Sequence, residues 1–171
     1  EFFSIGMRLL QFCSSLSLLL VFILAMTEEA AVVKAVINVG GGNSSIGPMC
    51  GNATVPCVSL RDASMACNAR LLQLPSGSRC EFQLAPGIYT GLNNTALALN
   101  HTVGGLIGQT GKKTETILDG ADLYAGLSAS STSITLSSLT FRHFLGSAFR
   151  WVAVESSVLN VSACSFESNG I

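Results

Sequence analysis

The chain has 171 residues, a length that suits a single domain. Charged residues make up 11% of it and the net charge is −1, so no polybasic stretch points to nucleic acid as a partner. Gly, Ser, Thr and Asn are abundant and aromatic residues are few, which favours strands and turns over helices.

The N-terminus has the layout of a secretory signal peptide. Arg8 precedes an apolar run from Leu9 to Ala25, and one positive charge before such a run is typical of these signals. A membrane anchor is the alternative, because the run approaches the roughly 20 apolar residues that span a bilayer. Serines within the run and its terminal position favour the signal. We predict a signal over residues 7–31, cleaved between residues 25 and 35, with residues 1–6 as an extension before the natural start.

The next segment predicts a strand over residues 32–39 that ends in Gly40, Gly41 and Gly42. A glycine-rich phosphate loop requires the spacing G-x-G-x-x-G and a helix directly after it. Ser45 stands where the last glycine belongs, and no helical pattern follows at once. We therefore interpret these glycines as a turn after a strand.

Export explains the cysteines, four of which cluster early in the chain. In an oxidising compartment they predict two disulfides, with three pairings open. Zinc is the competing interpretation, but the gaps are not those of C-x-x-C pairs and no histidine lies nearby, so we expect no metal and no cofactor. The disulfide candidates are Cys50, Cys57, Cys67 and Cys80.

Five sequons agree with export, although their use requires a eukaryotic secretory route. The candidate N-glycosylation sites are Asn43, Asn52, Asn93, Asn100 and Asn160.

A helix is predicted from Ser59 to Leu72. Ser59 is placed to cap its N-terminus with Asp62 as a carboxylate partner. Its apolar face consists of Leu60, Ala63, Cys67 and Leu71. A strand follows in which Cys80, Phe82 and Leu84 alternate with polar residues. A bridge from Cys67 to Cys80 would tie the helix to this strand.

From Leu97 onward the chain repeats a pattern of short strands, with an offset of 25 residues between two clear copies. The offset aligns Ile134 with Leu159, Leu136 with Val161, Leu139 with Cys164 and Phe141 with Phe166. Upstream it aligns Leu127 with Val152 and Ala129 with Val154.

Each copy must bend at small residues. Leu136 and Leu139 are three residues apart, so one straight strand cannot point both inward, and a corner at Ser137-Ser138 resolves this. The second copy bends likewise at Ser162-Ala163. An earlier and looser copy has Val103, a corner at Gly104-Gly105 and then Leu106, with residues 108–115 as an extra loop.

Short strands wound in one direction and stacked on their counterparts make a parallel β-helix. No coil of such a solenoid buries its apolar face alone, so terminal coils need caps. The helix from Ser59 to Leu72 is placed to cap the N-terminal coil. We predict an all-β solenoid over residues 32–171 with a short N-terminal capping helix, and we expect this to be the N-terminal part of a longer solenoid.

The segment from Cys80 to Gly91, the segment from Gly105 to Gly120 and the paired coils together resemble the right-handed β-helix of pectin-lyase-like proteins. "CSFESNG" carries the F-x-x-N element of polymorphic outer-membrane-protein repeats in Phe166 and Asn169, and "LGSAF" resembles a degenerate form of its partner G-G-A-[ILV]. The other coil has Phe144 in place of the asparagine.

The resemblance leaves two classes of function open, because it covers polysaccharide-cutting enzymes and non-catalytic surface proteins. It implies that an enzyme would place acids and bases on one outer face. We find no dense carboxylate cluster and predict no catalytic residue. The charged residues that we interpret as solvated loops or surface are Lys112, Lys113, Asp119, Asp122, Arg142 and Arg150.

The remaining chemically interesting side chains have plain interpretations. His101 and His143 have no acid or serine partner nearby in sequence, so we expect them on the surface. Trp151 is expected to face outward, beside an inward Val152, and to cover a neighbouring coil. Cys164 takes the inward place of Leu139 and is predicted to be a buried thiol.

The sequence therefore favours a secreted or cell-surface β-helix protein without catalysis, acting in adhesion, coat structure or glycan contact. Its expected partners are polysaccharide or other cell-surface proteins, and a membrane only through the N-terminal signal or a missing C-terminal region. The alternative is a polysaccharide lyase or hydrolase that acts on acidic, pectin-like polysaccharide with its site on missing C-terminal coils.

Overall fold

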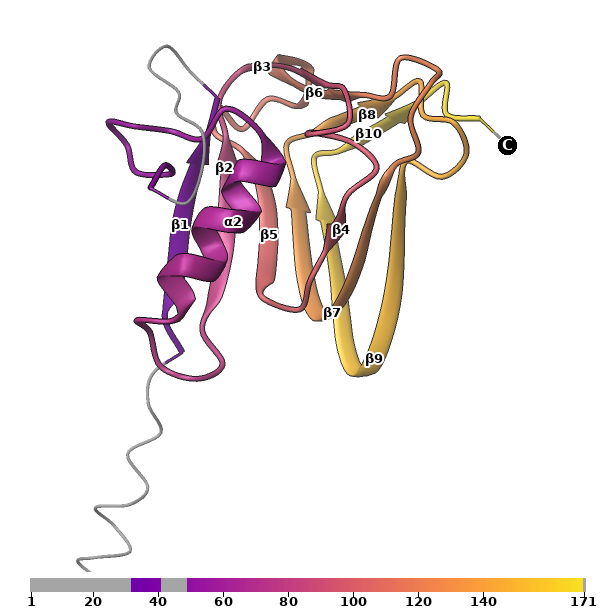
Figure 1. Cartoon of the computed structure of the whole chain (residues 1–171). Coiled ribbons are helices and arrows are strands. Elements are labelled where there is room, and N and C mark those ends of the chain that lie inside the picture. Colours follow the sequence, from indigo (N-terminus) through magenta and orange to yellow (C-terminus); the bar gives the residue numbers. More distant parts are fainter. Residues whose placement is uncertain (1–31, 41–48, 171) are drawn as a thin grey trace, which may run out of the picture. The chain divides into compact units, whose positions relative to one another are not determined.

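The computed structural model describes residues 32–40 and 49–170, leaving aside the side chains of residues 131, 132 and 154–156. This part of the chain consists mostly of strands in parallel sheets, with one α-helix (Figure 1). The predicted signal lies outside the described residues. Within them, no helix has the length and the apolar character needed to cross a membrane.

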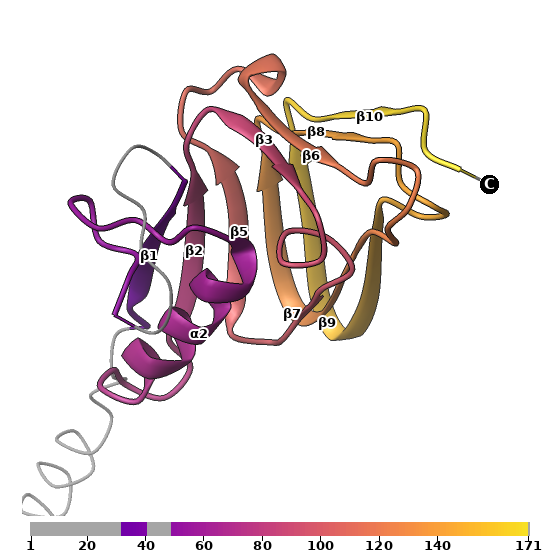
Figure 2. The same ribbon diagram turned by 45° about the horizontal axis from the view of Figure 1, so that its top comes forward.

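Parallel strands form two sheets. The first follows the order β1-β2-β5-β7-β4, with β9 also paired to β7, and the second follows β10-β8-β6-β3. Figure 2 shows strands of the first sheet side by side, with those of the second crossing beyond their ends. The bounds in the first sheet are β1 Lys34–Val39, β2 Arg79–Leu84, β4 Ala98–Leu99, β5 Val103–Gly108, β7 Leu127–Ser137 and β9 Phe149–Ser162. Those in the second are β3 Gly87–Thr90, β6 Thr116–Asp119, β8 Thr140–Arg142 and β10 Ser165–Glu167.

The predicted helix is present as α2, Leu60–Leu71. The Ser59 hydroxyl oxygen accepts a hydrogen bond from the Asp62 backbone N–H at 3.2 Å, and the same oxygen lies 2.5 Å from the Asp62 carboxylate. The first bond satisfies the Asp62 N–H, which has no partner within the helix, and the second holds the two side chains together. The helix packs on β1 and β2 with its buried residues Leu60, Ala63, Ala66 and Cys67, whereas Leu71 is only partly buried.

The four clustered cysteines form two disulfides, Cys50–Cys57 and Cys67–Cys80. The second is the bridge that the sequence suggested between the helix and the following strand. The first closes a loop that covers the outer edge of β1. There the Cys57 N–H donates to the Asn38 carbonyl oxygen at 2.8 Å, and the Asn38 N–H donates to the Gly51 carbonyl oxygen at 3.0 Å. The loop therefore occupies the outward backbone groups of Asn38 on this edge of the first sheet.

The 25-residue repeat is confirmed as strand pairing. Leu136 pairs with Val161 along β7 and β9, and Phe141 pairs with Phe166 along β8 and β10. The corners follow β7 and β9, where Ser138 and Ala163 adopt φ angles of 59° and 50°. At each corner one residue in the left-handed backbone conformation redirects the chain from the first sheet to the second.

Two details of the predicted register are wrong. Leu127 and Ala129 pair with Phe149 and Trp151 instead of Val152 and Val154, because the register shifts between Ser131 and Ser133. The proposed corner at Gly104-Gly105 is absent, since β5 continues through both glycines and Leu106 pairs with Leu136. The strand has an irregularity there instead: Cys80 pairs with Val103 and Glu81 with Gly105, so Gly104 is an extra residue without a partner on β2. The extra loop of residues 108–115 is present and contains a 3-10 turn, Lys113–Glu115.

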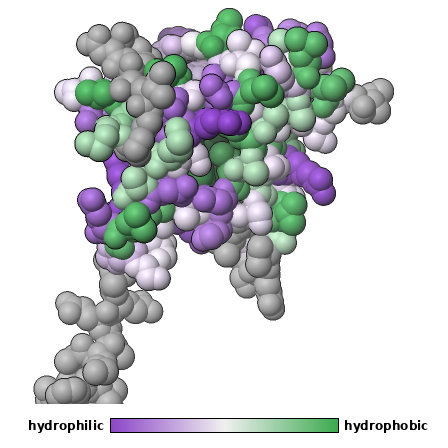
Figure 3. Space-filling model, in the orientation of Figure 1, coloured by the Kyte–Doolittle hydropathy of each residue, from purple (hydrophilic) through white to green (hydrophobic). Residues whose placement is uncertain are grey.

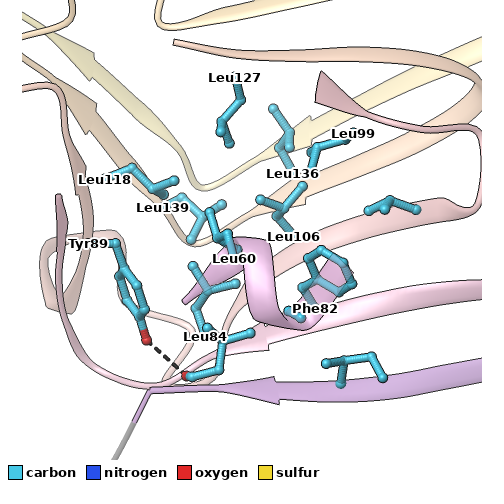
Figure 4. Packing of buried hydrophobic residues seen from close by; sticks show 14 of the residues in the cluster. Leu60, Phe82, Leu84, Tyr89, Leu99, Leu106, Leu118, Leu127, Leu136 and Leu139 are labelled. Atoms are coloured by element: carbon cyan, nitrogen blue, oxygen red, sulfur yellow. Dashed lines mark hydrogen bonds between the residues drawn. The ribbon is translucent and has the colours of Figure 1, made fainter. Parts of the chain in front are cut away.

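The core is built as columns of side chains that cross the strands. One column in the first sheet runs through Ile37, Phe82, Leu106, Leu136 and Val161. A second, in the other sheet, runs through Tyr89, Leu118, Phe141 and Phe166. Figure 4 shows that members of both columns point toward one another and toward Leu60 of α2. Each fully buried member contributes roughly 1.5–3 kcal/mol of burial free energy.

Tyr89 fastens the second sheet to the first. Its hydroxyl lies 2.9 Å from the Val39 carbonyl oxygen and 2.8 Å from that of Ala85 (Figure 4). Burial raises the pKa of the Tyr89 hydroxyl to about 12, against a smaller opposing effect of the Ala85 hydrogen bond. A Cβ on Gly40, whose φ is +77°, would lie on top of this hydroxyl, so the predicted turn at Gly40 requires glycine.

Asn169, of the F-x-x-N element, joins one sequence repeat to the preceding one. Its Nδ2 donates to the Phe141 carbonyl oxygen at 3.1 Å, and its Oδ1 accepts from the Phe144 N–H at 3.2 Å. Phe144 itself, at the equivalent position one repeat earlier, is buried in the core. The side-chain amide of Asn169 thus satisfies two backbone groups at the turn after β8.

We predict that Leu136→Ala lowers the free energy of unfolding by about 2–5 kcal/mol, because it opens a cavity in the middle of a column. Leu145→Ala removes an equally large side chain that is 65% exposed, and it should change stability by less than about 0.5 kcal/mol. Urea unfolding followed by the fluorescence of Trp151 measures both. Equal effects of the two variants would contradict the column.

Asn169→Ala should cost about 1–3 kcal/mol, because it leaves the Phe144 N–H and the Phe141 carbonyl without their partner. Asn160→Ala, which changes an exposed side chain on β9, is the matched control and should be close to neutral. Hydrogen exchange localises the effect: the Phe144 amide should lose protection in Asn169→Ala and retain it in the control.

Candidate functional site

The densest group of interacting ionisable side chains among those described lies on the outer face of the second sheet. We call it the Asp119 cluster, and it consists of Asp119, Arg142 and His143. Asp119 ends β6 and Arg142 ends β8, and the two residues are direct partners in the pairing of these strands. Their neighbours Leu118 and Phe141 are fully buried, so Asp119 and Arg142 point outward by strand alternation.

The Asp119 carboxylate is the centre of the cluster. Its Oδ2 accepts a hydrogen bond from Arg142 Nε at 2.8 Å, and its Oδ1 lies 3.4 Å from His143 Nδ1. The Ala121 N–H also donates to Oδ1, at 2.9 Å. The carboxylate is 13% exposed, while the side chains of Arg142 and His143 are 30% and 40% exposed. The cation and the imidazole therefore form the rim of the cluster.

The backbone around the cluster is tightly constrained. His143, Ala121 and Asp122 all adopt the left-handed conformation, with φ between 52° and 55°. The Asp122 N–H donates to the His143 carbonyl oxygen at 2.7 Å, which holds the two turns together. A Cβ on Gly120 would lie 2.5 Å from that same carbonyl oxygen, so the close approach of the turns requires glycine.

The electrostatics of the cluster favour an ionised carboxylate. Burial opposes ionisation of Asp119, but the hydrogen bonds from Ala121 and Arg142 and the charge of Arg142 outweigh it, and the pKa of Asp119 is lowered. A carboxylate with a lowered pKa is a poor general acid near neutral pH. It serves instead to hold the Arg142 guanidinium and to orient the His143 ring.

The cluster belongs to a longer outward row. Pairing places Thr90 of β3 beside Asp119, and Glu167 of β10 beside Arg142. Acid, base and acid thus alternate along three neighbouring strands, an arrangement that is favourable between directly opposed side chains. The Glu167 carboxylate also accepts a hydrogen bond from the Ser165 hydroxyl at 2.8 Å.

Sequence reasoning missed this cluster. It interpreted Asp119 and Arg142 as solvated charges and gave His143 no acid partner, whereas the structure brings all three together. The signal lay in the repeat: Asp119 and Arg142 become neighbours once Leu118 is aligned with Phe141, and the extra loop at residues 108–115 obscured that alignment.

Other charged residues conform more closely to the sequence interpretation. Lys112 pairs with Glu115 at 3.0 Å on the surface, and Asp122, Arg150 and His101 are exposed. Lys113 is also exposed, and its backbone oxygen accepts a hydrogen bond from the Thr140 hydroxyl. An ion pair that was not anticipated joins Lys34 to Glu81, whose side chain is 7% exposed.

Two other single-residue predictions require correction. Trp151 does not face outward: it pairs with the buried Ala129 and packs partly buried against the core, while Val152 is 48% exposed. The register shift between Ser131 and Ser133 reverses the facing of this part of β9. Cys164 was predicted to be a buried thiol, and it is a free thiol that is only half-buried.

A shallow cavity of about 350 Å³ lies on the outer face of the first sheet. Its floor is at Gly104 of β5, and Arg79, Thr135 and Asn160 are among its lining residues. The Arg79 guanidinium donates to the Ser133 carbonyl oxygen at 3.1 Å and so crosses the cavity from β2 to β7. The glycine at position 104 lies beside the Arg79 side chain, and the one at position 105 lies beside Glu81 and the Thr135 carbonyl oxygen.

The described face that carries α2 is neither mainly hydrophobic nor mainly hydrophilic, because residues of both kinds are interspersed over it (Figure 3).

Within residues 32–40 and 49–170 no group of three or more acidic, histidine or cysteine side chains is arranged to hold a metal ion. No family model, no curated protein and no solved structure matches the chain.

The Asp119 cluster predicts a pH-dependent contribution to stability. Because the folded-state pKa of Asp119 lies below its unfolded value of about 3.9, its contribution is present above that pH and is lost as the pH falls through the folded pKa. Asp119→Asn should therefore cost about 1–3 kcal/mol at pH 7 and progressively less below pH ~4.

Asp122→Asn, in the same loop and exposed, is the matched control and should stay within about 0.5 kcal/mol of the natural protein at neutral pH. Urea unfolding at a series of pH values measures both variants. A stability deficit of Asp119→Asn that stays constant into acid would show that the carboxylate charge is not what stabilises the cluster.

Proposed function

We propose that this chain is a secreted or cell-surface repeat protein with a right-handed parallel β-helix fold, and that it acts without catalysis in adhesion, coat structure or glycan contact. The observation that carries this proposal is the shared register of the two sheets. The offset of 25 residues holds from Ser133–Val158 in the first sheet to Arg142–Glu167 in the second. One turn of a solenoid has this property, because every strand then stacks on its own counterpart.

The handedness follows from the connections. Parallel strands of one sheet joined by crossovers wind right-handed in nearly all proteins, since only that hand packs a twisted strand back onto its sheet. The F-x-x-N asparagine supports the resemblance to pectin-lyase-like proteins and polymorphic outer-membrane-protein repeats, because it bridges two coils through backbone hydrogen bonds.

The environment of the protein is indicated by its covalent chemistry. Disulfides persist in oxidising compartments, so the two bridges suggest an extracellular or otherwise oxidising environment. A surface location, with polysaccharide or other cell-surface proteins as partners, is the interpretation that agrees with this chemistry and with the predicted signal.

The proposed lack of catalysis rests on two carboxylates that are each paired with a cation. Asp119 is neutralised by Arg142, and the buried Glu81 is neutralised by Lys34. Both pairs bridge neighbouring strands, so these charges stabilise the stacking of coils and are not concentrated around a reaction site.

An enzyme remains the second candidate: a polysaccharide lyase or hydrolase acting on acidic polysaccharide. The observation in its favour is the Asp119 cluster, where a guanidinium and an imidazole both lie within 3.4 Å of one carboxylate on the outer face. In such an enzyme Arg142 would bind a carboxylate of the substrate, and His143, oriented by Asp119, would carry a proton.

The deciding experiment uses the full chain expressed with its leader in eukaryotic cells. We expect the protein in the medium or on the cell surface, bound by immobilised polysaccharide or by cells, with no release of products from polygalacturonate. Products would appear as new reducing ends for a hydrolase and as unsaturated ends, absorbing in the ultraviolet, for a lyase.

His143→Ala is the variant that separates the two candidates, with His101→Ala as its exposed control. Loss of product release in His143→Ala alone would establish the enzyme and overturn the non-catalytic proposal. A protein that stays inside the cell would contradict the proposed location.

A further inference from the structure

We propose that, of the sequons within the described residues, Asn52 and Asn100 are the ones that carry N-linked glycans, and that Asn93 and Asn160 do not. This inference rests on the proposed export of the chain. Asn43 lies outside the described residues.

Asn52 sits in a compact turn within the loop closed by Cys50–Cys57. Its Oδ1 accepts hydrogen bonds from the Thr54 hydroxyl at 2.9 Å, the Thr54 N–H at 3.0 Å and the Val55 N–H at 2.6 Å. Three donors fix the side-chain oxygen toward the turn, so the amide nitrogen must point away from it. Both Asn52 and Thr54 are exposed.

Asn100 repeats this arrangement in the turn between β4 and β5. Its Oδ1 accepts hydrogen bonds from the Thr102 hydroxyl and from the Thr102 N–H. Its Nδ2 therefore points away from Thr102, and it donates one of its two hydrogens to Asn68 Oδ1 of α2 at 3.3 Å. Asn100 is exposed on the surface.

The geometry of these two sequons suits the transfer reaction. Nδ2 of the asparagine attacks the first sugar carbon of an oligosaccharide carried on a lipid diphosphate. The new N–C bond forms as the bond from that carbon to the diphosphate oxygen breaks, the lipid diphosphate leaves, and one amide proton passes to a base of the transferase. A hydroxyl that already donates to Oδ1 holds the acceptor amide in one orientation in a local turn, without help from distant residues.

The other two sequons use their hydroxyls elsewhere. At Asn93, the Thr95 hydroxyl is fully buried and donates to the Gly91 carbonyl oxygen at 2.9 Å. At Asn160, the Ser162 hydroxyl donates to the Ser137 hydroxyl at 3.1 Å, and the residues lie in the extended strand β9. Neither hydroxyl contacts its own asparagine.

The positions of Asn52, Asn100 and Asn160 have different consequences for the surface. Asn52 lies in the loop that covers the outer edge of β1, and Asn100 contacts α2, so glycans there would coat the capped side of the fold. Asn160 lines the cavity above Gly104 of β5, on the strand paired to β7. A glycan at Asn160 would fill that cavity and crowd the edge of β9.

The test is site-by-site occupancy on the full chain secreted from cultured eukaryotic cells. Enzymatic removal of the glycans in heavy-oxygen water converts each formerly glycosylated asparagine to a labelled aspartate, which peptide mass spectrometry detects. We expect occupancy of Asn52 and Asn100 to exceed that of Asn93 and Asn160 by at least several-fold. Equal or greater occupancy at Asn93 or Asn160, or none at Asn52 and Asn100, would overturn the inference.

Matched variants give a second readout. Asn52→Gln and Asn100→Gln should each remove one glycan from the intact protein, while Asn93→Gln and Asn160→Gln should leave its mass distribution unchanged apart from the substitution. Thr54→Ser and Thr102→Ser should retain the glycans that Thr54→Ala and Thr102→Ala lose. A secreted protein with another pattern contradicts this inference alone, whereas a chain retained in the cell without glycans contradicts export and this inference together.

Discussion

Register between successive parallel strands is the constraint on which the rest of this structure depends. The pairs Leu136–Val161 and Phe141–Phe166 extend two apolar columns, and the pair Asp119–Arg142 places opposite charges together on the outside. A slip by one residue would turn each apolar side chain toward solvent and each charge toward the core. Columns and ion pairs therefore specify the same alignment from opposite faces of the sheet, which gives the outward charges a structural purpose.

The two ends of the first sheet are treated differently. At β1, the Cys50–Cys57 loop binds the backbone of Asn38, and Arg70 of α2 donates to the Val36 carbonyl oxygen at 2.8 Å. At β9, Val158 and Val161 are 60% and 44% exposed, and the neighbouring Phe166 of β10 is 50% exposed. The backbone N–H and carbonyl of Asn38 are thereby occupied at the β1 edge and are not available to a partner strand.

Much of the local structure was predictable from the sequence, because local rules determine it. Ser59 and Asp62 mark the helix start, the spacing of Cys67 and Cys80 suits a bridge from helix to strand, and Ser138 and Ala163 stand at the corners. The Asp119 cluster was not predictable in this way. Its members are brought together by the pairing of β6 with β8, and the length of the loop of residues 108–115 before β6 is not encoded in any periodic pattern.

The errors in register have the same origin. A constant offset of 25 residues describes the pairing of β7 with β9 only from Ser133 onward. Before that point the offset is three residues shorter, as in the pair Leu127–Phe149. The shift turns Trp151 inward toward the space above Ala129, where a large ring fills volume that Val154 was expected to occupy. At Gly104-Gly105 the glycines mark an irregularity in the pairing of β2 with β5 and not a corner between the two sheets. Both details concern how two strands far apart in the sequence pair, and one repeat taken alone contains no information about the strand beside it.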